Sequence, residues 1–301
     1  MWFVGQVAGD RSQVSRCKLI FMPELPEVET IARGLASRVT GDFIESVWLG
    51  SKPEPLKSPA AEIAATLQSR RIADVRRMGK HIVFELVGEG RRARGRRSGQ
   101  RSDAKAQWIV HLGMTGSMLV CKPDAEIAKH THAVVKLASG RELRFVDPRR
   151  FGRLSVARDF DAGGCEPLDV KLDRFISLFQ GRKTPIKSAL LNQKLLRGVG
   201  NIYADESLFR AGIRPRRRAA SLSRDDFRRL YKSVQEVLKE AIALGGSSVS
   251  DYVNSDGQEG SFQLEHRVYG REGERCLKCK AAIKRIVIAG RSSHYCPKCQ
   301  K

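Results

Sequence analysis

Four cysteines near the C-terminus constrain the fold of this 301-residue chain more than any other feature. They form two close pairs, CLKC and CPKC, which are separated by 16 residues. Pairs at this spacing can place four thiolates tetrahedrally around one ion, and this paired-knuckle pattern favours zinc over an iron–sulfur cluster. Four thiolates leave no open position for water. We therefore expect one structural zinc ion, held by Cys276, Cys279, Cys296 and Cys299, in a hairpin too short to bury a core alone.

The charge of the chain indicates a polyanionic partner. Lysine and arginine number 55 against 33 aspartates and glutamates, which gives a net charge of +22. A surface this basic attracts polyanions, of which nucleic acid is the commonest. No apolar run approaches the ~18 residues that a membrane helix needs. The seven cysteines are an odd number without a secretory signal, which argues against a disulfide framework.

The first half of the chain, residues 22–159, predicts a helix followed by a β-sandwich. A helix is expected from Pro26 to about Leu35, because proline suits a first helical turn and the apolar residues recur on one face. The segments HIVFELV, QWIVHLGMTGSMLV and AVVKLASGRELRFVD predict strands, the last with a hairpin turn near Ser139 and Gly140. Several short strands in series are typical of a sandwich or barrel.

One segment inside this region has a different composition. Residues 91–105, RRARGRRSGQRSDAK, contain seven basic residues and one acid. The segment has no apolar period, so we predict a disordered hairpin loop that could contact phosphate without sequence preference.

Beyond residue 159 the pattern becomes helical, with a linker predicted at 160–180 and a helical domain at 181–262. The segment TPIKSALLNQKLL predicts a helix capped by Thr184, and RGVGN breaks that helix. Asn201 is expected to cap the next helix, and a long helix is predicted from Ser223 to Leu244. A glycine-rich turn before a helix N-terminus attracts phosphate, so GVGNIYADES is interpreted as a backbone-phosphate clamp.

Three residues cluster at the head of the first helix: Pro23, Glu24 and Glu27. Alone they are explained by ordinary helix-start chemistry, because acids and proline favour the first turn. In the chain as written, the nitrogen of Pro23 is a tertiary amide that cannot act as a nucleophile, since its lone pair is engaged in resonance.

The order of the motifs resembles one family. MPELPEVETIARGL, RRMGKHIVFEL, HLGMTGSM, KHTH, DPRRFG, GVGNIYADESLFRAGI, SDGQEGSF and the cysteine pairs occur in this order. Together they closely resemble bacterial formamidopyrimidine-DNA glycosylase over residues 22–301. The start PELPE is also similar to this family rather than to endonuclease VIII, which usually begins PEGPE.

The resemblance implies an α+β multidomain fold: an N-terminal β-sandwich with a leading helix, a helix–two-turn–helix domain, and a zinc-finger hairpin at 263–301. It implies a bifunctional base-excision-repair glycosylase and AP lyase that removes oxidised purines, such as 8-oxoguanine and formamidopyrimidines, by β,δ-elimination. The expected partner is double-stranded damaged DNA, and no organic cofactor or membrane is implied. A monomer in the bacterial cytoplasm, associated with the nucleoid through DNA, is expected.

The resemblance also assigns catalytic roles. The nitrogen of Pro23 would attack the sugar C1′ and form an iminium, with Glu24 as general acid–base and Glu27 as support. Lys80 matches a lysine that contacts phosphate and assists elimination. Arg291 matches the zinc-hairpin arginine that contacts the lesion phosphates and is assigned to the later elimination.

DNA-binding roles follow in the same way. His130, Arg182 and Asn201 match DNA-contacting positions. Met114, Arg149 and Phe151 match the residues that fill the gap left when the damaged base leaves the stack. Residues 247–258 match the lesion-reading loop, in which Ser250 stands where many members have lysine or arginine.

Two alternatives remain at this point. One is a glycosylase of the endonuclease VIII type that acts on oxidised pyrimidines. The other is a non-catalytic DNA-binding protein whose proline is blocked. Against the second, we expect that Met22 is the true start, that this methionine is removed, and that residues 1–21 are absent from the working enzyme.

Overall fold

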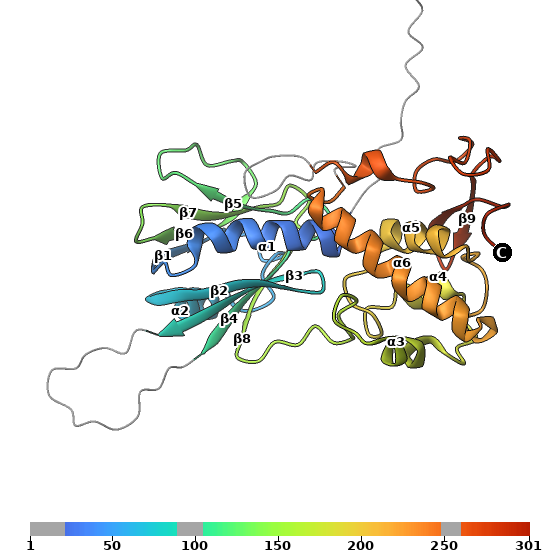
Figure 1. Ribbon diagram of the computed structural model, residues 1–301. Coiled ribbons are helices and arrows are strands. Elements are labelled where there is room, and N and C mark those ends of the chain that lie inside the picture. The colour runs from blue at the N-terminus through green and yellow to red at the C-terminus, as the bar shows by residue number, and fades with distance from the viewer. Residues whose placement is uncertain (1–21, 89–104, 248–259) are drawn as a thin grey trace, which may run out of the picture.

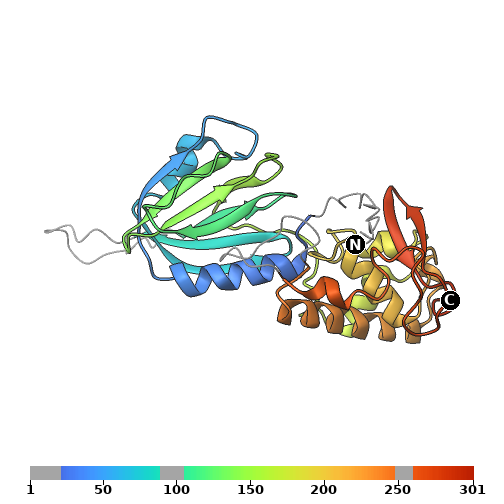
Figure 2. The ribbon, with the colours of Figure 1, turned by 90° about the horizontal axis from the view of Figure 1, so that it is seen from above.

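The computed structural model describes residues 22–88, 105–247 and 260–301. A lobe of strands and a lobe of helices lie side by side, and a small hairpin finger rests on the helical lobe (Figure 1 and Figure 2). The predicted extension at 1–21 lies outside the described residues, as do the basic loop, apart from Lys105, and the lesion-reading loop, apart from Ser247.

The first lobe is the predicted β-sandwich. Its strands are β1 (Ile44–Leu49), β2 (Arg70–Met78), β3 (His81–Gly88), β4 (Ala106–His111), β5 (Ser117–Cys121), β6 (Thr131–Leu137), β7 (Glu142–Val146) and β8 (Arg153–Ala157). They form two antiparallel sheets of four strands, in the orders β1-β6-β7-β5 and β2-β3-β4-β8. The predicted turn joins β6 to β7, where Gly140 has a positive φ of 80°.

The strand register places several turns at one end of the sandwich. His111 pairs with His81 in β3 and with Arg153 in β8. In the other sheet, Val146 pairs with both Ser117 and Thr131. The β2–β3, β4–β5 and β7–β8 turns and the start of β6 therefore all lie at the end of the sandwich that faces the helical lobe (Figure 1).

Helix α1 (Leu25–Val39) begins one residue before the predicted start at Pro26. It lies along the opening between the two sheets (Figure 1). Its apolar face, Val28, Ile31 and Leu35, is buried in the sandwich core. A second helix, α2 (Ala60–Leu67), contributes Ile63 and Leu67 to the same core.

The second lobe is helical, as predicted. It consists of α3 (Leu172–Phe179), α4 (Ile186–Leu190), α5 (Asn201–Ala211) and α6 (Arg224–Ala243), with short 3₁₀ turns η1 (Ala219–Ser221) and η2 (Phe262–Glu265). The long helix agrees with its prediction, and Ser223 Oγ caps it by accepting from Asp226 N at 3.1 Å. None of the helices in the described ranges is long and apolar enough to cross a membrane.

Two local predictions for this lobe need correction. The segment 160–180, predicted as a linker, contains α3, whose Phe175 and Phe179 are fully buried in the helical core. Helix α4 is only five residues long and begins after Pro185 rather than at a Thr184 cap. The amide that such a cap would bind, Ile186 N, instead donates to the carbonyl of Arg217 at 2.7 Å.

The finger contains the hairpin of β9 (Lys284–Ile288) and β10 (Arg291–Tyr295). A two-residue turn, Ala289 and Gly290, joins the strands with positive φ at both positions, as type I′ hairpins require. The finger has a very small apolar core around Val268 and Ile283, which also packs against Phe209 of α5. This core is too small to hold the finger together alone.

Candidate functional site

The head of α1 is inserted into the helical lobe. Leu25 is fully buried in the helical core, and its amide donates to the carbonyl of Gly198 at 3.0 Å. Gly198 has φ +88°, and a Cβ there would lie 2.8 Å from the Leu25 side chain. The turn before α5 therefore needs glycine at this position, both for its conformation and for its close contact with α1.

Glu24 lies at the N-terminus of α5. Its carboxylate is 3.2 Å from the amide of Ile202 and 3.5 Å from that of Tyr203. Burial raises the pKa of Glu24 to about 7, although the charge of Lys80 and the two amides oppose the rise. A carboxyl group with a pKa near 7 can both donate and accept a proton at neutral pH.

This arrangement corrects the interpretation of GVGNIYADES. The free amides at the start of α5, predicted to bind a DNA phosphate, are directed at the carboxylate of Glu24. The N-cap is Gly200, and Asn201 is the first helical residue. A capping side chain at Asn201 is not needed, because Glu24 supplies the negative oxygen from another part of the chain.

Gly200 provides a test of this packing. A Cβ at this position would lie 2.2 Å from Cδ of Glu24, so we expect Gly200→Ala to push the carboxylate away from α5. Overpacking of this kind costs about 1–3 kcal/mol, which urea unfolding should detect. Gly88→Ala is the matched control, because a Cβ there meets no atom within 4 Å. Equal stability of the two variants would contradict the packing described here.

Glu27 fixes the head of α1 from the other side. It is fully buried, and it accepts from the amides of Glu24 and Ser247, each at 2.8 Å, and from the hydroxyl of Tyr203. Burial raises the pKa of Glu27, and these hydrogen bonds oppose that rise. Glu27 thus ties α1 to α5 and to the segment that follows α6.

Lys80 lies at the β2–β3 turn and is partly exposed. Its surroundings lower its pKa through desolvation, while the charges of Glu24 and Glu27 oppose this effect and Arg291 adds to it. Lys80 is therefore within electrostatic reach of α1 and of the finger. Lys80 thus interacts electrostatically with two segments far apart in the sequence, one carrying Glu24, which directly follows Pro23, and the other carrying Arg291.

A carboxylate that the sequence did not single out holds the Lys80 turn. Glu166 accepts from Arg77 Nη1 at 2.8 Å, from Arg197 Nε at 2.8 Å and from the amide of Gly79 at 2.9 Å. It therefore links the end of β2 to the loop before α5. No local pattern in the sequence indicates this contact, because its partners lie 31 to 89 residues away.

A second group that sequence reasoning missed supports Arg291. Lys187 of α4 is fully buried and forms an ion pair with Asp205 at 2.7 Å. Its Nζ also donates to the carbonyl of Ser292 at 2.5 Å, and Asp205 accepts from the amide of His294 at 2.8 Å. Because both bonds reach the strand that begins with Arg291, the buried pair fastens the hairpin to the helical lobe.

Two more of the residues predicted to contact DNA, Asn201 and Arg182, lie near α5 and α4. Asn201 donates through Nδ2 to Ser292 Oγ at 3.2 Å, so it lies beside Arg291. Arg182 is exposed in the turn between α3 and α4, where its Nε donates to the carbonyl of Leu178 at 2.6 Å.

Met114, Arg149 and Phe151 lie in two turns at the same end of the sandwich, Met114 between β4 and β5 and the other two between β7 and β8. Phe151 is 47% exposed. The guanidinium of Arg149 lies 4.7 Å from the centre of its ring, in cation–π contact.

His130 lies just before β6, on the rim of a surface pocket of about 380 Å³. The pocket is also lined by Trp48, Lys52, Lys129 and Arg150. Trp48 is 53% exposed. Cations around an exposed aromatic ring are typical of a surface that follows a nucleic-acid backbone.

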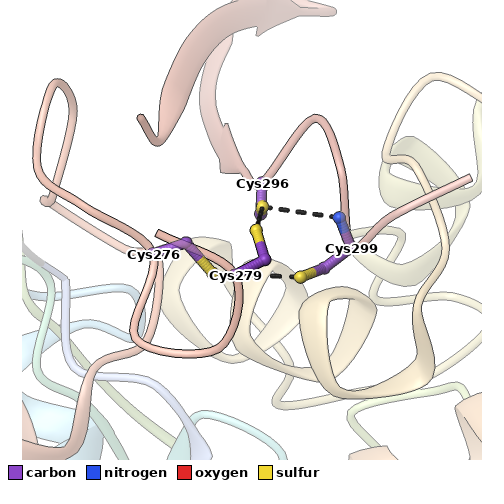
Figure 3. A group of neighbouring side chains, drawn as sticks. All are labelled: Cys276, Cys279, Cys296 and Cys299. Atoms are coloured by element: carbon purple, nitrogen blue, oxygen red, sulfur yellow. Dashed lines mark hydrogen bonds between the residues drawn. The ribbon is translucent and has the colours of Figure 1, made fainter. Parts of the chain in front are cut away.

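The four predicted cysteine ligands lie together in the finger, where Figure 3 shows their side chains converging. Their sulfur atoms all lie within 4.8 Å of one another, with Cys279 and Cys296 at 3.3 Å and Cys276 and Cys299 at 3.9 Å. Zinc–sulfur bonds of ~2.3 Å in a tetrahedron require sulfur atoms about 3.8 Å apart. The group therefore fits a zinc ion, as predicted.

Family models match three successive stretches of the chain. Residues 22–154 match the formamidopyrimidine-DNA glycosylase N-terminal domain, 164–253 the H2TH domain of the same enzyme, and 273–301 the zinc finger found in FPG and IleRS.

Similar proteins cover nearly the whole chain. A formamidopyrimidine-DNA glycosylase of Solibacter usitatus is 43% identical, with 93% of this chain and all of the relative aligned. The crystal structure of the MutM (Fpg) protein from Thermus thermophilus is 41% identical, covering 92% of this chain and 98% of that one, with a TM-score of 0.77.

A third relative was solved with DNA. A mutant of Lactococcus lactis FPG, in complex with DNA containing Fapy-dG, is 33% identical with a TM-score of 0.81, and 93% of this chain and all of that chain are covered. The family resemblance expected from the motifs is thus confirmed, and the chain belongs to the formamidopyrimidine-DNA glycosylase family.

Proposed function

We propose that the protein is a bifunctional DNA glycosylase and AP lyase that removes oxidised purines through the nitrogen of Pro23. The observation that carries this proposal is that Glu24, which directly follows Pro23, is buried at the start of α5 and interacts electrostatically with Lys80, which in turn interacts with Arg291. A carboxyl group with a pKa near 7 and two cations are the groups needed to move protons and to hold phosphates at an attacked sugar.

In the proposed reaction, the lone pair of Pro23 nitrogen forms a bond to C1′ while the C1′–base bond breaks. The damaged base leaves with the electron pair of the broken C1′–base bond and takes up a proton. Opening of the sugar ring gives an iminium, a fixed cation that acts as an electron sink. It permits loss of the 3′ phosphate and then of the 5′ phosphate by β- and δ-elimination, and hydrolysis returns the free amine.

The pKa of an α-amino nitrogen explains why an N-terminal proline would serve. Its ordinary value is about 8, against about 10.4 for a lysine. About a tenth of the amine is therefore unprotonated at neutral pH. The nearby Lys80 and Arg291 are instead assigned to the phosphates, Lys80 as an aid to elimination and Arg291 in the later elimination step.

We propose that the working enzyme begins at Pro23, after Met22 has been removed. The match to the N-terminal domain begins at residue 22, and 93% of this chain aligns with the whole length of its relatives. A free nitrogen would then lie next to the buried carboxyl of Glu24.

Glu24→Gln tests the general acid–base role. Base release should fall by about 10²–10⁴-fold, with DNA affinity little changed. The wild-type rate requires free amine and protonated Glu24, so it should peak between about pH 7 and 8. Without the carboxyl group the decrease in rate on the alkaline side of this maximum should disappear, and the rate should rise with pH until the amine is deprotonated.

Single-turnover base release measured across pH checks this expectation. Glu62→Gln, an exposed glutamate on α2, is the matched control and should keep the wild-type profile. A Glu24→Gln variant that retains the decrease at high pH would show that another group carries the proton.

The substrate class is proposed from the relatives. The Lactococcus protein was solved with DNA containing Fapy-dG, and the Solibacter relative is named formamidopyrimidine-DNA glycosylase. Excision from 8-oxoguanine duplexes should therefore exceed excision from thymine-glycol duplexes. A clear preference for thymine glycol would instead support an enzyme of the endonuclease VIII type.

The DNA partner is proposed to bind across the end of the sandwich that faces the helical lobe. Met114, Arg149 and Phe151 would fill the gap left by the extruded base, as apolar and cationic wedges do in other duplexes. His130, Arg182 and Asn201 would contact phosphates. We propose that the protein acts as a monomer on DNA in the cytoplasm.

A further inference from the structure

One buried carboxylate in the β7–β8 turn, which carries Arg149 and Phe151, reaches across to the β4–β5 turn, which carries Met114. We propose that Asp147, acting through the hydroxyl of Thr115, is a positioning residue that holds these three side chains as one preformed wedge. This inference rests on the proposed function, because it concerns how the wedge enters damaged duplex DNA.

The contacts of Asp147 reach both turns. The residue is fully buried, and its Oδ1 accepts from Thr115 Oγ1 at 2.5 Å, next to Met114 in the β4–β5 turn. Its Oδ2 accepts from the amide of Gly152 at 2.7 Å, and Oδ1 lies 3.2 Å from the amide of Arg149. One side chain therefore contacts Arg149 itself and the residues that directly follow Met114 and Phe151.

The two turns also touch directly, backbone against backbone. Gly113 has φ +66°, and a Cβ there would lie 2.5 Å from the carbonyl carbon of Phe151 and 2.6 Å from the amide of Gly152. No side chain fits between the turns at this point. The backbone contact therefore prevents the two turns from moving closer together. The hydrogen bond between Thr115 and Asp147 opposes their separation.

The backbone of Asp147 extends the unit to His130. Its amide donates to the carbonyl of His130 at 2.9 Å, and its carbonyl lies 2.9 Å from Nε2 of His132. His130 is a predicted phosphate contact. The wedge and this contact are thus set by the same residue, so a bound phosphate would fix where the wedge meets the base stack.

A preformed wedge is useful because opening the stack is costly. Unstacking a base step requires a few kcal/mol. If the two turns became ordered only on binding, the entropy cost of ordering them would add to this free energy. Hydroxyl-to-carboxylate bonds are among the stronger hydrogen bonds in proteins. Thr115 is therefore the contact whose loss should separate the Met114 turn from the Arg149–Phe151 turn.

The test compares Thr115→Val, which keeps the shape of the side chain and removes the hydroxyl, with Thr115→Ser, which keeps the hydroxyl. With the chain beginning at Pro23, we expect Thr115→Val to slow base release from an 8-oxoguanine duplex by about 10-fold or more, as loss of a bond to a charged group would. Cleavage of a single strand containing an abasic site should stay within about twofold, because a single strand has no base-paired stack for the wedge to enter.

A fluorescent base analogue placed opposite the lesion reports duplex opening directly. The fluorescence change on binding should be smaller for Thr115→Val than for the wild-type enzyme, and close to wild type for Thr115→Ser. Equal base release and equal fluorescence in the two variants would overturn the positioning role. So would an equal loss on the single strand, which would indicate a general structural defect.

The two proposals fail in different ways. A wild-type enzyme that cleaves no abasic strand contradicts the proposed function. The positioning role is still tested in that case, because the fluorescence change requires only binding.

Discussion

A chain that begins at Pro23 is expected to be trapped covalently by borohydride on DNA containing an abasic site, whereas the uncleaved 301-residue chain is expected to give no adduct. In the longer chain the nitrogen of Pro23 is an amide, whose lone pair is not available to attack C1′. Loss of a covalent nucleophile reduces the rate by on the order of 10⁴-fold or more.

Mass analysis of each preparation, followed by gel separation of the trapped complex, measures this difference. A chain beginning at Pro23 with the variant Glu62→Gln is a suitable positive control, because Glu62 is exposed on the sandwich. Efficient trapping by a chain shown by mass to retain residues 1–22 would exclude Pro23 as the nucleophile. It would direct attention to lysines near the site, of which Lys80 has a lowered pKa.

Removal of zinc is expected to have the second large effect. Structural zinc contributes about 10–16 kcal/mol of binding free energy to small fingers, and the finger core here is only a few residues. Without the ion the β9–β10 hairpin should unfold and carry Arg291 away from Lys80. Both large lobes have cores of their own and should remain folded.

Cys296→Ser and chelation of the wild-type protein provide two routes to this state. Binding to lesion duplexes should weaken by roughly two orders of magnitude, while circular dichroism should retain most of the helix signal. Cys165→Ser is the control, because Cys165 is a half-buried free cysteine outside the finger. Unchanged binding by a zinc-free protein would show that the finger does not hold Arg291 in place.

Local patterns predicted a large part of the fold. The spacing of the cysteines indicated the finger, and the apolar stripe with its Ser223 cap indicated α6. Strand alternation and the turn at Ser139 and Gly140 indicated the sandwich. Each of these signals is contained within a few tens of residues, which is why it can be read without the structure.

The contacts that build the site were harder to predict, because they join distant segments. The start of α5 looked like a phosphate clamp, and only the structure shows that Glu24, 178 residues away from Ile202, occupies it. Asp147 and Glu166 were not singled out either, since a lone carboxylate in a turn is ordinarily solvated. Their roles depend on three-dimensional neighbours rather than on spacing.

The place of α1 has a mechanical consequence. Leu25 belongs to the core of the helical lobe, and Val28, less than one turn later, belongs to the core of the sandwich. A rotation of the lobes about this junction, such as one that admits a duplex, would leave the carboxyl group of Glu24 almost stationary at the pivot. The wedge turns belong to the sandwich and are not part of this junction, so the same rotation would displace them relative to the helical lobe.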